Sequence, residues 1–270
     1  MLLGQALKGI PREKYFISVK FGVLFAPDGK LYGLDVHTFH IKAQLTYSLH
    51  RLGIDYVDLY QPARMDSAIP VEDIVSELAE LKKAGYIRNI GLTEIDADTL
   101  RRAHKVHPIH TVESQYSLIE RGIEEDIIPA ARELGVKVLA FGALGHGLLN
   151  DRVITEGKSP TASATGGPML NSENLPKNLP LVKALKAIAN DKGVSLSQLV
   201  TAWVLTKCPD IMCLIGTTSP NHLQDNIDAL NIALTPYDMN RIESTASSHK
   251  VYGNEMRKLF FADGIPSFRQ

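Results

Sequence analysis

Apolar runs of strand length alternate with helix-period patterns along almost the whole chain of 270 residues. We predict strands at 16–19, 56–60, 87–92, 111–114, 136–141 and 211–215. We predict helices at 38–52, 70–84, 97–104, 123–134, 181–190, 195–206, 220–230 and 236–247, with Thr38 and Ser195 as N-caps. Strict alternation implies right-handed crossovers and therefore a parallel sheet covered by helices.

The number of strands bounds the architecture. A closed (β/α)8 barrel of the TIM type needs eight strands, and six are predicted. We therefore expect a single domain over 1–270 with about six βα units, a barrel that lacks its first strands and helix. An open doubly wound sheet does not require eight strands, so it is the alternative architecture. It is the weaker one, because no Gly-x-Gly-x-x-Gly follows an early strand.

Two other segments bear on the organisation of the chain. The first seven residues lack a cationic lead and a long apolar region, so they resemble the last turns of an amphipathic helix rather than a secretory signal. Residues 151–179 are rich in Gly, Pro, Ser, Thr and Asn, which predicts a long loop, and loops of that length are usually functional or disordered.

Charge and cysteine content exclude several classes of function. Lys plus Arg is 29 and Asp plus Glu is 30, which argues against a nucleic-acid or membrane-surface partner. Cys208 and Cys213 are the two cysteines, which predicts no disulfide framework and a reducing compartment, the cytoplasm. The histidines show no metal-ligand spacing, so we expect no metal site. The expected partner is a small molecule, and the oligomeric state is not encoded in any pattern we can read.

In a barrel, function lies where the strands end at their carboxyl side. Lys20 closes the first predicted strand, either with its ammonium reaching solvent or with that charge placed in a pocket. The last strand turns through Gly216 into a helix near Ser219, where backbone N–H groups and the helix dipole favour a phosphate. The alternative there is a plain helix cap, which needs Ser219 alone.

Seven segments at these strand ends occur in the same order along the chain as in a known protein family. They are 2–7 (LLGQAL), 17–22 (ISVKFG), 49–60 (LHRLGIDYVDLY), 85–93 (GYIRNIGLT), 115–118 (QYSL), 144–149 (LGHGLL) and 215–226, which contains IGTT and HLQDN. Together they resemble the aldo-keto reductases over essentially the whole chain. Residues 60–66 (YQPARMD) look more specifically like the pyridoxal reductase-type branch.

The resemblance implies an NADP(H)-dependent oxidoreductase that reduces a small aldehyde or ketone, with a pyridoxal-like substrate possible. In the family a Tyr is the general acid, a Lys lowers its pKa, an Asp supports the Lys, and a His often orients the carbonyl. Lys20 matches the Lys, and the His falls at Ala63. The Asp and Tyr of the family lie upstream of the segment that matches 2–7, so we expect them before Met1 and assign neither role within this chain.

The resemblance also implies a cofactor-binding set. Its members are Thr93, Glu94, Glu113, Phe141, Gly142, Leu144, Gly216, Thr218, His222, Asp225 and Asn226. Glu94 stands where an Asn is more usual and Glu113 where a Gln is usual. The family often has an Arg near Thr218 to hold the 2′-phosphate, and none stands here, so NAD stays possible beside NADP.

Three hypotheses follow. The chain is part of an active reductase, as Lys20 and the cofactor set indicate. Alternatively, it is a catalytically impaired or non-enzymatic homologue that keeps nucleotide binding, as Ala63 and the unassigned Tyr indicate. In the third, the chain does not fold stably alone, because an open barrel exposes two strand edges.

Overall fold

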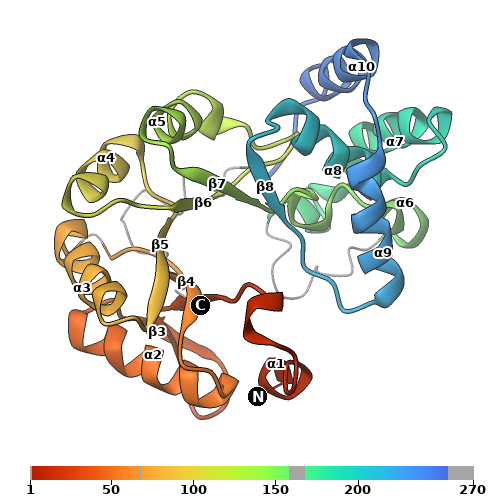
Figure 1. Ribbon diagram of the computed structural model, residues 1–270. Coiled ribbons are helices and arrows are strands. Elements are labelled where there is room, and N and C mark those ends of the chain that lie inside the picture. The colour runs from red at the N-terminus through yellow and green to blue at the C-terminus, as the bar shows by residue number, and fades with distance from the viewer. Residues whose placement is uncertain (1, 67, 158–167, 255–270) are drawn as a thin grey trace. The chain divides into compact units, whose positions relative to one another are not determined.

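A computed structural model describes residues 2–66, 68–157 and 168–254. These residues form two compact units. The first contains 2–113 and 126–137, and the second contains 114–125 and the described residues from 138 onward. Figure 1 colours the chain by residue number and labels the elements.

The first unit is built on parallel strands. They are β1 (Ser18–Phe21), β4 (Val57–Pro62), β5 (Ile87–Thr93) and the start of β6 (Thr111–Gln115). They lie in the order β1-β4-β5-β6, and each neighbouring pair is parallel. The register sets Lys20 opposite Gln61 and Thr93 opposite Glu113, which fixes the neighbours of the candidate site.

Four helices accompany these strands: α2 (Thr38–Leu52), α3 (Val71–Lys83), α4 (Ala97–Val106) and α5 (Ile127–Leu134). Helices α2 and α3 lie on the same side of β4 and β5 (Figure 1). Each buries one apolar stripe, for example Leu45 on α2 and Leu78 on α3. Helix α2 ends at Gly53 in the left-handed region, as predicted, with φ 69°. Its N-cap is His37 and not Thr38, because the extended backbone that precedes the helix ends one residue earlier than predicted.

Two further strands were not predicted. Strands β2 (Val23–Phe25) and β3 (Leu31–Leu34) form an antiparallel hairpin. None of their residues is buried, and Phe25 is 67% exposed, so the alternation of buried and exposed residues that marks a strand is missing. Helix α1 (Leu2–Ala6) agrees with the helical turns expected at the start, although none of its residues is buried.

The second unit pairs strand β7 (Lys137–Phe141, from Val138 onward) with β8 (Ile211–Leu214) in parallel. Its helices are α6 (Asp151–Glu156), α7 (Leu175–Asp191), α8 (Leu196–Lys207), α9 (Pro220–Asp228) and α10 (Pro236–Ser247). Ser195 caps α8 within a capping box, as predicted. The predicted loop over 151–179 is too long, because α6 and the start of α7 fall within it, while 158–167 lie outside the described residues.

Short 3-10 turns complete the two units at Arg12–Lys14, Gly122–Glu124, Gly145–Gly147, Pro168–Leu170 and Ala229–Asn231. The core of the second unit is centred on Trp203 of α8, which is fully buried and lies 5.7 Å from the ring of Tyr116. Among the helices that the structure describes, none combines the length and the apolar character needed to cross a membrane.

Candidate functional site

A partly buried ion pair forms the centre of the polar cluster at the carboxyl ends of the first unit's strands. Lys20, at the end of β1, donates from Nζ to Glu113 Oε1 at 2.5 Å. Glu113 Oε2 accepts a second hydrogen bond, from Gln61 Nε2 at 2.7 Å. The side chain of Glu113 is only 6% exposed, whereas that of Lys20 is 34% exposed. The ammonium therefore faces partly outward while its carboxylate is enclosed.

The enclosure of Glu113 makes this contact more consequential than a surface ion pair. A buried carboxylate needs a counter-charge and hydrogen bonds, because removal of either partner leaves a charge in a low-dielectric surrounding. Both needs are met here, since one oxygen of Glu113 meets the ammonium of Lys20 and the other meets the amide of Gln61. Gln61 is itself 1% exposed, so its side chain has little freedom to move away.

Gly91 on β5 leaves the space that the cluster occupies. A Cβ added to Gly91 would collide with Thr111 Oγ1 and would lie 2.5 Å from Gln61 Oε1. Because β5 lies between β4 and β6, a side chain at Gly91 would stand between Gln61 and Glu113. A glycine at this position therefore lets residues of two non-adjacent strands meet.

Two predicted cofactor contacts, Thr93 and Glu94, lie beside this cluster. Thr93 is fully buried, and its hydroxyl has no hydrogen-bond partner within the described residues. Glu94 has a left-handed backbone with φ 50°, and its N–H donates to the carbonyl of Glu113 at 2.8 Å. Left-handed non-glycine residues concentrate at functional sites, where the surrounding structure holds them in place. An orphaned hydroxyl of this kind suits contact with the amide group of a ligand.

The second unit carries the remaining predicted contacts in two places. Phe141 is the last residue of β7, Gly142 and Leu144 follow it, and all three are half-buried. The carbonyl of Phe141 accepts from the N–H of Tyr116 at 3.0 Å, and Gly142 turns the chain with φ 74°. The Phe141 ring therefore stands at a strand end with part of its surface accessible.

The other place is the turn from β8 into α9. Gly216, Thr218 and His222 are exposed, while Asp225 and Asn226 are half-buried. Residues at 222, 225 and 226 are three and four apart, which puts them on one side of the helix. Ser219 caps α9 by accepting from the N–H of His222 at 3.5 Å, so the cap is formed by Ser219 as the plain alternative requires.

The tyrosines of this region are engaged elsewhere. Tyr60 is fully buried and donates its hydroxyl to the carbonyl of Ile41 at 3.0 Å, and burial raises its pKa. The ring of Tyr56 lies between two guanidinium groups, 4.0 Å from that of Arg12 and 4.1 Å from that of Arg88. Ala63, which matches the position of the family's His, is 8% exposed and offers no hydrogen bond from its side chain.

Sequence reasoning missed two features of the first unit. Gln61 was placed after the second predicted strand but was given no role, although its register opposite Lys20 could have drawn attention to it. The second feature is Asp35, whose carboxylate contacts Nδ1 of His37 at 2.8 Å and Nδ1 of His40 at 2.6 Å. Burial raises the pKa of Asp35, but the N–H of His37 and the two imidazoles outweigh it and bring the pKa to about 2.

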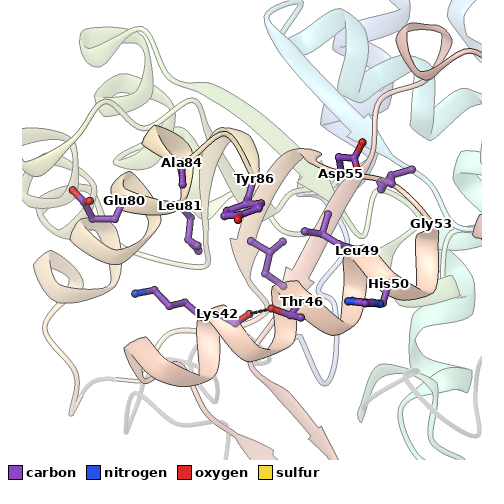
Figure 2. Close-up of a pocket in the computed structure, with 12 residues that line it drawn as sticks. Lys42, Thr46, Leu49, His50, Gly53, Asp55, Glu80, Leu81, Ala84 and Tyr86 are labelled. Atoms are coloured by element: carbon purple, nitrogen blue, oxygen red, sulfur yellow. Dashed lines mark hydrogen bonds between the residues drawn. The ribbon is translucent and has the colours of Figure 1, made fainter.

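A cavity of about 820 Å³ lies between α2 and α3, away from the predicted site residues. Figure 2 shows that its lining comes from most of the length of α2, from the end of α3 and from Tyr86, which precedes β5. A smaller cavity of about 470 Å³ is lined at the amino ends of strands by residues such as Phe16, Asn89 and His110. Neither lining includes a residue of the predicted catalytic or cofactor set.

Comparison with known proteins gives a consistent picture. A model of the "Aldo/keto reductase family" matches residues 1–247. The chain is 36% identical over 244 residues to "Probable aldo-keto reductase 1" of Glycine max, which covers 90% of this chain and 70% of the soybean protein.

Solved structures show the same similarity. A glycerol dehydrogenase from Gluconobacter oxydans matches with a TM-score of 0.82 at 26% identity, over 92% of this chain and 76% of the enzyme. A thermostable aldo-keto reductase in complex with the inhibitor epalrestat matches with a TM-score of 0.68 at 25% identity, over 90% of this chain and 76% of the other. The α/β fold of the TIM-barrel class is thereby confirmed, and the open doubly wound sheet is excluded.

Proposed function

The chain belongs to the aldo/keto reductase family, and we propose that it binds NADP(H) and reduces a small aldehyde or ketone. The partly buried ion pair between Lys20 and Glu113 carries this proposal. It holds an ammonium at the carboxyl ends of parallel strands, where barrels of this class place their chemistry. We expect a pyridoxal-like aldehyde among the substrates, and the cytoplasm as the site of action.

The residues of each unit have separate parts in this proposal. In the first unit, Thr93 and Glu94 offer a hydroxyl and a carboxylate to the carboxamide of the cofactor. In the second unit, Phe141 offers a ring face for stacking, and the accessible residues Thr218 and His222 offer polar groups to the adenosine end. Bound NADP(H) supplies the hydride, and the protein positions it.

Lys20 is the residue to which we assign the acid–base part of the reaction. An ammonium close to a phenol favours the phenolate, which makes the phenol a better proton donor near neutral pH. Since Tyr60 donates its hydroxyl to Ile41, it is poorly placed to be that phenol. We therefore expect this chain to turn over well below about 1 per second, the lower end of ordinary enzyme rates.

A second candidate function is nucleotide binding without catalysis. Ala63 favours it, because a methyl group cannot orient a substrate carbonyl. The engagement of the Tyr60 hydroxyl favours it too, because a proton donor is then missing from that strand end.

Two measurements with the 270-residue chain test the proposal. NADPH is titrated by fluorescence, and NADPH oxidation is then followed with pyridoxal and other small aldehydes. We expect saturable binding and slow oxidation that Lys20→Met lowers about tenfold or more with little change in NADPH affinity. Lys30→Met is the matched control, because the Lys30 side chain is 83% exposed on the hairpin.

The outcomes separate the two functions. Binding with no oxidation that depends on Lys20 would leave nucleotide binding alone as the function. Failure to bind NADPH would reject both candidates. Turnover of about 1 per second or more would show that the chain does contain an efficient proton donor.

A further inference from the structure

We propose that Glu113 is a positioning residue for Lys20 rather than a contact of the cofactor, and that Gln61 holds Glu113 in that position. The catalytic consequence of this contact rests on the proposed function. The positioning role departs from the role that the family resemblance implies for position 113. The geometry of the carboxylate carries it.

Both oxygens of the Glu113 carboxylate are already engaged within the first unit. Oε1 accepts from Lys20 Nζ at 2.5 Å, and Oε2 accepts from Gln61 Nε2 at 2.7 Å. The side chain is 6% exposed, so little of its surface can meet a ligand. A carboxylate accepts hydrogen bonds and donates none, which matches a Lys ammonium and the NH₂ group of a Gln.

The strand framework explains why this carboxylate can reach the ammonium. Lys20 and Gln61 are register partners on β1 and β4, whereas Glu113 lies on β6 beyond β5. The missing side chain of Gly91 on β5 opens the path, because a Cβ there would lie 2.5 Å from Gln61 Oε1. The backbone of β6 at Glu113 is fixed in turn, since its carbonyl accepts from the N–H of Glu94 at 2.8 Å.

A substitution that keeps the shape but removes the charge isolates the role. Glu113→Gln retains a side chain of the same length and an oxygen that can accept from Lys20. It removes the negative charge that lies 2.5 Å from the Lys20 ammonium. A neutral amide holds that ammonium less firmly, because hydrogen bonds to a charged group are roughly twice as strong as neutral ones.

The first arm of the test measures Lys20 directly, without cofactor or substrate. An acylating reagent labels the folded chain over a range of pH, and mass spectrometry of the Lys20 peptide gives the rate. In Glu113→Gln we expect labelling of Lys20 to be about tenfold faster near pH 8, because the amine is no longer held by the buried carboxylate.

Matched variants support this arm. Glu133→Gln removes the charge of an exposed ion pair with Arg101 and should leave Lys20 labelling within about twofold. Gln61→Met loosens Glu113 while keeping its charge, and should raise Lys20 labelling by about two- to fivefold. Gln61→Met also keeps the proposal testable if Glu113→Gln does not fold.

The second arm measures cofactor affinity. In Glu113→Gln we expect the dissociation constant for NADPH to stay within about threefold, while the slow oxidation falls about tenfold. An unchanged rate of Lys20 labelling in Glu113→Gln, or in Gln61→Met where only that variant folds, would overturn the positioning role. A tenfold change in NADPH affinity with an unchanged labelling rate would return Glu113 to the cofactor contacts. If the native chain fails to bind NADPH, the proposed function fails, and the labelling arm still decides whether Glu113 positions Lys20.

Discussion

Gly91 occupies a place where the neighbouring strands leave no room for a side chain. Its Cβ position would lie 2.5 Å from Gln61 Oε1 and 3.1 Å from Leu59 Cδ1, and it would collide with Thr111 Oγ1. Both Gln61 and Leu59 are buried, so neither can move aside into solvent. A glycine is therefore required at position 91 by the packing of neighbouring side chains and not by the backbone conformation.

We expect Gly91→Ala to destabilise the chain by about 1–3 kcal/mol, the usual cost of inserting atoms into a packed interior. Urea unfolding measures this change. Gly33→Ala is the control, because nothing lies within 4 Å of the added Cβ there, and its effect should stay within about 0.5 kcal/mol. Equal effects of the two substitutions would show that the space at Gly91 is not needed.

The separate residues of the site were visible in the sequence, but their contact was not. Lys20 was predicted because it closes an apolar strand, and Glu113 was named from the family resemblance. Their ion pair joins positions 93 residues apart, and it depends on Gly91, whose role appears only when three strands are aligned. Gln61 was passed over for the same reason, since a strand-end Gln carries no signal of its own.

Helix α10 is an element whose start is defined by side chains. Thr235 and Asp238 form a capping box, in which each side chain accepts from the other's backbone N–H. Asp238 also accepts from Lys192 Nζ at 2.7 Å, which joins the start of α10 to the end of α7. The hydrogen bond from Lys192, followed by those from Thr235, lowers the pKa of Asp238 to about 2.

This shift makes the stability contributed by Asp238 depend on pH. The pKa is depressed in the folded chain from 3.8, so the contribution is complete above that value and is lost as the pH falls toward about 2. We expect Asp238→Asn to cost about 1 kcal/mol at pH 7, after allowance for solvent screening, and progressively less below about pH 4.

Urea unfolding of the native chain and of Asp238→Asn at several pH values between 7 and about 3 measures the difference. Asp98→Asn on α4 is the control, because its side chain is 92% exposed, and its effect should be small at every pH. A cost for Asp238→Asn that does not change with pH would contradict the assignment.

At the scale of elements, the helix boundaries were predicted correctly where common capping residues mark them. The bounds of α2 and α10 agree with the prediction, since glycine, proline and hydroxyl caps mark their ends. The start of α7 was missed because Pro176 and Pro180 were interpreted as loop residues. Pro176 lies in the first turn, where its missing N–H is of no consequence, and sequence alone does not separate that use from a loop.

The strands of the first unit were predicted unevenly from the sequence. The parallel strands of the first unit were predicted from apolar runs, whereas its hairpin was not, because strands without a buried face show no period of two. The choice between a barrel and an open sheet depended on comparison, since alternation of strands and helices is common to both.

At the scale of the whole molecule, the composition of the proposed cofactor site predicts how strongly the protein prefers NADPH over NADH. Residues 211–226, which hold the proposed adenosine contacts, contain neither Arg nor Lys. In the proposed site, donors such as the Thr218 hydroxyl and the Asn226 amide would then meet the 2′-phosphate of NADPH without an Arg or a Lys beside them. A neutral hydrogen bond contributes about 0.5–1.5 kcal/mol net, and pairing with a charged group about twice that.

We therefore expect NADPH to bind no more than about tenfold more tightly than NADH, since about 1.4 kcal/mol corresponds to a factor of ten. Because a ligand that binds only the folded state stabilises the whole chain, thermal unfolding at matched cofactor concentrations measures the difference. Thr218→Arg should raise the preference for NADPH by supplying a charge, and Thr217→Arg, one residue away, is the control for added positive charge. A native preference above about 100-fold would require a cation from another part of the chain.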